Sequence, residues 1–251
     1  MKTGIAVSME SSSQKIARSP NGDCTLVIMA KAPRPGVVKT RLAQSLPSPA
    51  VIELYRCLLN DTMALARSLD GVEVAIMCPA FDVEDLSRAA GDAMRVVAQI
   101  GNGLAAGLTS VFAHFAVSGR RRIVAFNSDS PHLPPSVLQI AFDALASCDL
   151  VVGPTHDGGY YLVGAKASHP GLFASSGMGT TNALEALLEH ARSLGLSVRF
   201  TDPFYDIDVA ADLSRLAAEL QLAPARAPRT AEWLVEWGRA VAQPGQSGRD
   251  T

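Results

Sequence analysis

The chain has 251 residues, of which 48% are apolar and 18% charged, and its net charge is −2. This composition excludes a disordered or fibrous chain, and the length allows one α/β domain with a full core. The small net charge argues against nucleic-acid and membrane-surface partners, so any anion site must be local. No apolar run approaches the ~20 residues that a membrane span needs.

The four cysteines are Cys24, Cys57, Cys78 and Cys148, tens of residues apart. No pair has the spacing of a zinc knuckle, so we expect them to be small buried hydrophobes. Because no signal peptide precedes them, the expected setting is the reducing cytoplasm.

The first part of the chain changes character near residue 23. Residues 1–22 are rich in Ser, Lys and Gly without periodicity, which predicts a disordered extension. Residues 25–30 are continuously apolar, as in a strand covered on both faces of a sheet. Ser48 is the expected N-cap of the next helix, and Gly71 its end. Its predicted buried face repeats at steps of three and four: Val51, Tyr55, Leu58, Thr62, Leu65 and Leu69.

Strands and helices then alternate. We expect strands over 72–78, 95–99, 122–127 and 149–154, and helices over 83–90, 104–117 and 137–146. This alternation predicts a Rossmann-like α/β fold with a largely parallel, doubly wound sheet. A strand over 160–164 follows too closely for a helical crossover, so it should be antiparallel.

The last part should complete a single domain over 23–222. Met178 to Thr181 are expected to cap a helix that runs to about Leu194, followed by a strand over 197–201 and a helix over 209–220. Residues 223–251 form a tail with a short amphipathic helix over 230–237. Its two tryptophans, Trp233 and Trp237, would pack on the body or form an oligomer contact, so a homodimer is one expectation.

A carboxylate stands at the end of the strand over 122–127. Asn127, Ser128 and Asp129 follow the apolar run, and prolines then stop the strand. In open α/β sheets, ligands bind at the carboxyl ends of the strands. Asp129 is therefore a candidate functional residue, although it could instead cap the turn.

A basic loop follows the first strand. Lys31, Arg34, Lys39 and Arg41 surround Gly36 in a Pro-Gly segment, which predicts a cradle for a pyrophosphate. The alternative is a solvated basic loop. The loop lacks both the Walker spacing and the three-glycine dinucleotide fingerprint.

Further carboxylates follow later strands. Asp157 precedes Gly158 and Gly159, which would let the backbone approach a ligand closely. Asp206 and Asp208 point the same way if their segment is extended, although Asp208 could be the N-cap of the next helix. With Asp129 and phosphate oxygens, Asp206 and Asp208 would suit Mg²⁺ or Mn²⁺. The five histidines show no metal or triad spacing, and no G-x-S-x-G elbow is present.

Four blocks of this sequence resemble a bacterial family of proposed glycosyltransferases, DUF2064, which is linked to arsenosugar biosynthesis. The blocks are residues 29–42, the Ser128-Asp129-Ser130-Pro131 corner, residues 153–162 and Tyr205-Asp206-Ile207-Asp208. The resemblance covers about residues 25–216. It implies a glycosyltransferase A fold, a divalent metal, and a nucleotide bound over the first half of the sheet.

The resemblance also implies roles for matching residues. Asp129 would bind the metal, Lys31, Lys39 and Arg41 would face the phosphates, and Asp157 and Asp208 would line the acceptor side. The predicted nucleotide-binding set is Ala30, Lys31, Pro33, Gly36, Lys39, Arg41, Gly158 and Gly159.

The chain departs from the family pattern at several positions. Ser130 replaces a common Cys, Gly103 and Gly107 stand where an acidic residue and an arginine are common, and Met178 replaces a tryptophan. These changes bear on which donor and acceptor are used.

Three functions are compatible with this sequence. The first is a metal-dependent glycosyltransferase that takes a nucleotide-sugar donor and a small-molecule acceptor, with Asp157 as the candidate general base. The second is a nucleotidyltransferase that uses a nucleoside triphosphate and releases pyrophosphate. The third is a nucleotide- or partner-binding protein without catalysis, which the glycines after Gln99 and the residue at Met178 would favour.

Overall fold

The structure is a computed structural model that describes residues 23–119, 121–174 and 182–242. The expected disordered extension over 1–22 and the expected helix cap over residues 178–181 lie outside the described residues.

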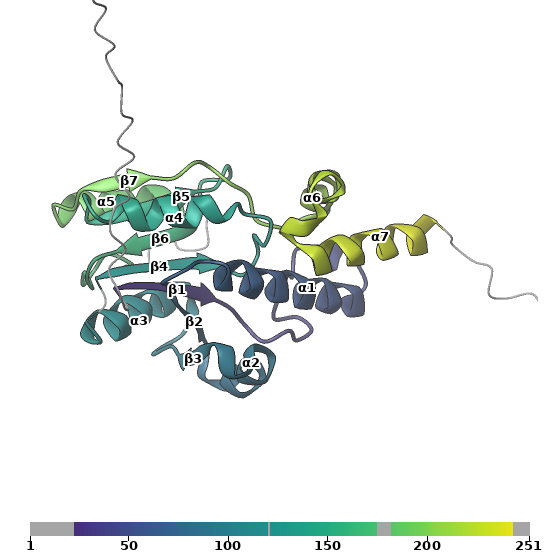
Figure 1. The fold of residues 1–251 in the computed structure, drawn as a ribbon, viewed down its shortest axis with the longest axis horizontal. Coiled ribbons are helices and arrows are strands. Elements are labelled where there is room, and N and C mark those ends of the chain that lie inside the picture. Colours follow the sequence, from purple (N-terminus) through teal and green to yellow (C-terminus); the bar gives the residue numbers. More distant parts are fainter. Residues whose placement is uncertain (1–22, 120, 175–181, 243–251) are drawn as a thin grey trace, which may run out of the picture.

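The described residues form a seven-stranded mixed sheet with the strand order β3-β2-β1-β4-β6-β5-β7 (Figure 1). The strands are β1 (Cys24–Met29), β2 (Glu73–Cys78), β3 (Arg95–Ala98), β4 (Arg122–Asn127), β5 (Leu150–Pro154), β6 (Tyr160–Ala165) and β7 (Val198–Phe200). All of them are parallel except β6, which pairs antiparallel with both β4 and β5. The expected antiparallel strand is therefore confirmed, and the carboxyl ends of β1, β4, β5 and β7 share one edge.

Helices cover both faces of this sheet. They are α1 (Ser48–Arg67), α2 (Val83–Ala90), α3 (Gly103–Val117), α4 (Pro135–Ala144), α5 (Ala183–Ser193), α6 (Ala210–Leu222) and α7 (Pro228–Ala242). One buried cluster joins α1, α2 and α4 to the sheet, and a second joins α3 and α5 to its other face. This arrangement is a three-layer α/β/α fold, in agreement with the predicted Rossmann-like, doubly wound sheet.

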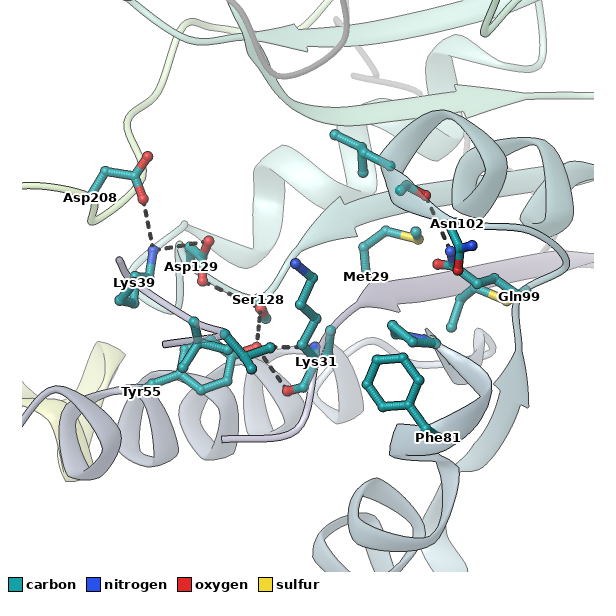
Figure 2. A pocket seen from close by; sticks show the side chains of 17 residues that line it. Met29, Lys31, Lys39, Tyr55, Phe81, Gln99, Asn102, Ser128, Asp129 and Asp208 are labelled. Carbon is teal, nitrogen blue, oxygen red and sulfur yellow. Dashed lines mark hydrogen bonds and ion pairs between the residues drawn. The ribbon is translucent and has the colours of Figure 1, made fainter. Parts of the chain in front are cut away.

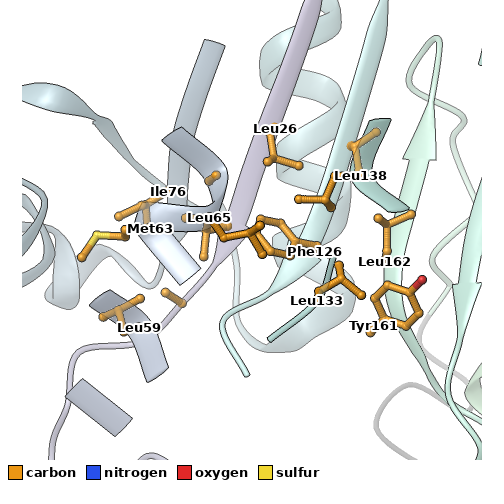
Figure 3. Close-up of a cluster of buried hydrophobic side chains, with 14 of the residues drawn as sticks. Leu26, Leu59, Met63, Leu65, Ile76, Phe126, Leu133, Leu138, Tyr161 and Leu162 are labelled. Atoms are coloured by element: carbon orange, nitrogen blue, oxygen red, sulfur yellow. The ribbon is translucent and has the colours of Figure 1, made fainter. Parts of the chain in front are cut away.

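The larger cluster explains why the central strands are continuously apolar. Leu26 of β1 and Phe126 of β4 are almost fully buried, and they belong to the same buried cluster as Met63 of α1 and Leu138 of α4 (Figure 3). Because both faces of β1 and β4 are covered, neither strand can alternate apolar and polar residues.

The outer side of α1 carries a third apolar cluster, formed with α6 and α7. Trp233 is buried there, and its ring stacks on Trp237 with centroids 5.5 Å apart. At the start of α7, the buried carboxylate of Asp61 on α1 accepts hydrogen bonds from Thr230 N at 2.8 Å and Thr230 Oγ1 at 2.7 Å. The tryptophan helix therefore packs on the body of the protein.

Three local expectations need correction. Pro47, and not Ser48, is the N-cap of α1, because Ser48 already has a helical position ahead of Pro49, and α1 ends at Arg67 rather than at Gly71. All four cysteines are free, but only Cys78 and Cys148 are buried, while Cys24, at the start of β1, and Cys57, in the middle of α1, are half-buried. The six residues of the predicted α1 face are all buried, as expected.

None of the helices within the described ranges combines the length and apolar character that crossing a membrane requires.

Candidate functional site

Three segments meet at the carboxyl ends of the central strands. The basic loop leaves β1, the Ser128–Ser130 corner leaves β4, and residues 202–208 follow β7. β1 and β4 are neighbours, so the first two segments meet directly. The third must return from the far edge of the sheet.

Residues 202–208 return by crossing the ends of β5 and β4. Phe204 N donates to the carbonyl of Pro154 at 3.0 Å, and Ile207 N donates to the carbonyl of Asp129 at 3.3 Å. The buried Ser130 Oγ donates to the carbonyl of Tyr205 at 3.0 Å. These bonds hold the segment against the corner that carries Asp129.

The crossing brings three carboxylates together. Asp129, Asp206 and Asp208 each offer an oxygen, and these three atoms lie within 4.8 Å of one another. All three residues are half-buried. Carboxylate oxygens are the hard ligands that Mg²⁺ and Mn²⁺ prefer. The donor set therefore fits the divalent ion that the sequence predicts.

Lys39 reaches this carboxylate cluster from the basic loop. Its Nζ lies 2.9 Å from Asp129 Oδ2 and 3.1 Å from Asp208 Oδ1, and its side chain is 2% exposed (Figure 2). Arg41 Nη1 lies 3.5 Å from Asp208 Oδ2 and stays largely exposed. The loop thus places one buried and one exposed cation beside the acidic cluster.

The local field shifts the pKa values of this cluster in opposite ways. Burial alone would lower the pKa of Lys39, but the charges of Asp129 and Asp208 outweigh it and raise the pKa. Burial, with the nearby charges of Asp208 and Asp129, raises the pKa of Asp206 to about 6. The three carboxylates therefore carry more negative charge than Lys39 alone can balance. A divalent cation bound among them would reduce their mutual repulsion.

The expected alternative role of Asp208, as the N-cap of α6, is not the one the structure shows. The carboxylate of Asp212 accepts the backbone N–H groups of Asp208 at 2.9 Å and Val209 at 2.8 Å. Because Asp212 satisfies the helix start, the Asp208 side chain is available to face Lys39 and Arg41.

A cavity of about 400 Å³ opens beside the carboxylates. At one end lie Lys39, Asp129 and Asp208, and at the other lie Phe81, Gln99 and Asn102 (Figure 2). Lys31 and Ala30 of the basic loop also line it. One end of this cavity is therefore strongly charged, while the other is apolar with amide groups.

Tyr55 lines the same cavity, and the sequence did not mark it as a site residue. Its hydroxyl lies 3.0 Å from Ser128 Oγ and donates to the carbonyl of Lys31 at 3.2 Å, while Ser128 Oγ donates to Asp129 Oδ1 at 3.3 Å. Burial is the main cause that raises the pKa of Tyr55 to about 12. Tyr55 thus joins the basic loop to the Asp129 corner. Its position on the apolar face of α1 made it look like an ordinary core residue.

Arg34, unlike Lys31 and Lys39, does not line the cavity. Its guanidinium forms ion pairs with Asp82 and Asp85, at the start of α2. It therefore holds the Pro-Gly loop against α2. Lys31, which is exposed, has no carboxylate within ion-pair distance among the described residues.

Seven of the predicted site residues lie outside the cavity lining: Pro33, Gly36, Arg41, Asp157, Gly158, Gly159 and Asp206. Asp157 is exposed, and its Oδ1 accepts hydrogen bonds from Thr155 Oγ1 at 2.5 Å and Gly159 N at 3.3 Å. The Thr155 hydrogen bond is the main cause that lowers the pKa of Asp157. These contacts stabilise the turn between β5 and β6.

Comparisons with known proteins agree with this fold. Residues 62–180 match the family DUF2064, described as "Uncharacterized protein conserved in bacteria". The match confirms the resemblance to DUF2064. Comparison with curated proteins gives no match.

Solved structures extend the likeness over nearly the whole chain. A proposed nucleotide-diphospho-sugar transferase from Desulfovibrio desulfuricans G20 is 26% identical, with a TM-score of 0.81, over 89% of this chain and 98% of that one. A cytidylyltransferase from Leptospira borgpetersenii is 11% identical, with a TM-score of 0.54, over 91% of this chain and 100% of that one. A nucleotidyl transferase from Methanothermobacter thermautotroptrophicus is 16% identical, with a TM-score of 0.53, over 80% and 99% of the two chains. The segment that matches DUF2064 thus lies in a fold that this chain shares with these solved structures.

Proposed function

We propose that this protein is a metal-dependent glycosyltransferase that moves a sugar from a nucleoside diphosphate to a small-molecule acceptor. The observation that carries the proposal is the cavity with Asp129, Asp208 and Lys39 at one end and apolar and amide groups at the other. Such a cavity suits a ligand that has phosphates at one end and a base at the other. The proposal takes residues 23–222 as one domain, with the helix of the tail packed on it.

The residues at the charged end would each act on the diphosphate. Asp129, Asp206 and Asp208 would hold a divalent ion, which would supply Lewis-acid stabilisation of phosphate oxygens. Lys31 and Arg41 are exposed cations that can contact the phosphates directly. Lys39, held between two carboxylates, would keep those carboxylates in place and add positive charge behind the diphosphate.

In this reaction the acceptor hydroxyl oxygen bonds to the anomeric carbon of the sugar. The bond between that carbon and the β-phosphate oxygen breaks, the nucleoside diphosphate leaves, and the hydroxyl proton passes to a base. Asp157 stays the predicted base, although its contacts support a turn-stabilising role. An Asp157→Asn variant separates the two roles, because loss of a base lowers kcat without weakening donor binding.

A second candidate is a nucleotidyltransferase, which two observations favour. The fold is also that of solved nucleotidyltransferases, and three cations of the basic loop, Lys31, Lys39 and Arg41, could serve a triphosphate. Here an acceptor phosphate oxygen would attack the α-phosphorus, and pyrophosphate would leave.

The released product distinguishes the two candidates. The purified protein with Mn²⁺ is incubated with radiolabelled nucleotide-sugars or nucleoside triphosphates and pools of small alcohols and sugar phosphates. Release of nucleoside diphosphate from a nucleotide-sugar, dependent on acceptor, supports the glycosyltransferase. Release of pyrophosphate from a triphosphate would contradict the glycosyltransferase proposal and support the nucleotidyltransferase. Tight nucleotide binding without either product would support a binding protein without catalysis.

A further inference from the structure

Gln99 stands at the apolar end of the cavity, at the point where β3 leads into the loop before α3. Its Nε2 donates to the carbonyl of Gly101 at 3.0 Å and to that of Gly103 at 3.2 Å. Both amide hydrogens are thereby used. The opposite placement of the amide would set its oxygen against two carbonyl oxygens, so the surroundings determine which way it faces.

The amide oxygen of Gln99 is left as an acceptor. Among the described residues, no donor contacts Gln99 Oε1. A side chain at Gly107 would displace Gln99, because a Cβ atom there would lie 2.7 Å from Gln99 Oε1 and 2.8 Å from Met29 Cε. Glycine at position 107 therefore lets Gln99 and Met29 keep their places beside each other (Figure 2).

The loop that holds Gln99 is itself fixed. Ile100 N donates to Ser110 Oγ at 2.8 Å, and Ser110 Oγ contacts the carbonyls of Ile100 at 3.2 Å and Ala106 at 2.8 Å. Gly101 and Gly103 both have positive φ angles, which few other residues adopt. A fixed acceptor discriminates well between ligands that present a donor and ligands that present an acceptor, because the amide cannot rotate to offer its N–H group instead.

An aromatic ring stands at the same end. Phe81 lines the cavity although it is 68% exposed, and Leu104, 47% exposed, lines it as well. Exposed apolar side chains at the mouth of a polar cavity suit a flat ligand that stacks on them.

We propose that Gln99 selects the base of the nucleotide, and that its fixed carbonyl favours bases with an exocyclic amino group, namely cytosine, adenine or guanine, over uracil, thymine and hypoxanthine. The amino group would donate to Gln99 Oε1, whereas a keto oxygen at the same place would meet another oxygen. This inference rests on the proposed function, since it assumes that a nucleotide occupies the cavity.

Matched nucleotides test this inference directly. CDP carries an amino group at ring position 4, where UDP carries a keto oxygen, and N3 is protonated only in UDP. IDP is the partner of ADP, with a keto oxygen in place of the 6-amino group, and the partner of GDP, whose 2-amino group it lacks. We would measure the Kd of all five by calorimetry with the full chain and Mn²⁺. At least one amino nucleotide should bind tenfold or more tightly than its partner. The reason is that Gln99 Oε1 would have a hydrogen-bond donor in the complex with the amino nucleotide and none in the complex with its partner.

Variants assign that preference to Gln99. Gln99→Met, which removes the acceptor, should reduce the preference to about threefold or less. Gln139→Met is the matched control, because Gln139 is an exposed amide on α4 that bonds only to Asp143 among the described residues. It should leave the preference unchanged.

The outcomes separate this inference from the function on which it rests. Equal or tighter binding of UDP than CDP, together with IDP binding as well as ADP and GDP, overturns the role of Gln99 but leaves nucleotide binding in place. A preference that survives in folded Gln99→Met overturns it as well. Absence of binding by all five nucleotides contradicts the proposed function itself, and the inference with it.

Discussion

At the scale of single residues, Asp206 is a carboxylate whose charged form is disfavoured by burial and by neighbouring carboxylates. Its pKa of about 6, against an ordinary value near 3.8, means that the folded state favours the protonated carboxyl. Between these two values the folded state binds more protons than the unfolded state, so the contribution of Asp206 to stability falls as pH rises through this window. Above pH 6 the destabilisation is complete.

An Asp206→Asn variant should therefore be more stable than the wild type in the absence of metal. In EDTA at pH 8 we expect a gain of about 1–3 kcal/mol in the free energy of unfolding, which disappears near pH 4. Urea unfolding at several pH values measures it. A gain that is the same at pH 4 and pH 8 would show that charge on Asp206 is not the cause.

Ser130 is a second residue with a specific local role. Its hydroxyl joins the corner of Asp129 to Tyr205, beside Asp206. Ser130→Ala would leave the buried carbonyl of Tyr205 without this partner, at a cost of about 1–3 kcal/mol. Because the bond aligns two carboxylate-bearing segments, we also expect Mn²⁺ to bind about threefold to tenfold more weakly.

A calorimetric Mn²⁺ titration of Ser130→Ala measures this effect. Ser136→Ala, an exposed serine at the start of α4, is the control. Loss of stability with unchanged Mn²⁺ affinity would mean that Ser130 supports the fold but does not align the carboxylates.

At the scale of elements, α7 is attached at its first turn by a residue far away in the sequence. Asp61 on α1 is 2% exposed and accepts hydrogen bonds from Thr230. Asp61→Ala would remove the buried acceptor and leave the first turn of α7 unsatisfied. We expect a loss of about 2–4 kcal/mol, concentrated in the docking of α7.

The two tryptophans report this docking directly, since the chain has no others and both lie on α7. In Asp61→Ala, tryptophan fluorescence should shift to longer wavelength at lower urea concentration than the circular dichroism of the whole protein. Glu53→Ala, an exposed change on the same helix, should keep the two transitions together. Coincident transitions in Asp61→Ala would show that α7 unfolds only with the rest.

The elements themselves could largely be predicted from the sequence. The strands are continuously apolar because both faces of the sheet are covered, and the short spacing between β5 and β6 excludes a crossover helix. The first and last residues of the helices were harder to predict, because local hydrogen bonds determine where a helix begins and ends. Asp212 caps α6 from inside its first turn, and the apolar pattern that located the helix contains no sign of this.

Part of the candidate site, namely Asp129 and the basic loop, could be predicted from the order of strands in the chain. Asp129 and the basic loop follow parallel strands, and carboxyl ends of parallel strands meet at one edge. Side chains that join distant segments gave no such signal. Tyr55 resembles a core residue on α1, Arg34 resembles another phosphate ligand but pairs with Asp82 and Asp85, and Gln99 lies in a loop without periodicity.

At the scale of the whole molecule, the order of the strands brings distant segments of the chain together around one cavity with a charged end and an apolar end. Residues 202–208 cross from β7, at one edge of the sheet, to β4 in its centre, and so complete the carboxylate cluster beside the basic loop. The loop between β3 and α3 supplies the other end. Nucleotide and metal should therefore bind together, each strengthening the other, because the phosphates and the carboxylates would share the ion.

The measurement that tests this account most directly is thermal unfolding of the wild type and Asp129→Asn with nucleoside diphosphates, in Mn²⁺ and in EDTA. Asp92→Asn, an exposed carboxylate outside the cavity, is the control. At 100-fold excess over Kd, a nucleotide should stabilise the wild type and Asp92→Asn by about 2.7 kcal/mol in Mn²⁺, and much less in EDTA. Asp129→Asn should fold but lose the Mn²⁺-dependent part. Equal stabilisation of Asp129→Asn and the wild type, with or without Mn²⁺, would contradict a metal-dependent nucleotide site at these carboxylates.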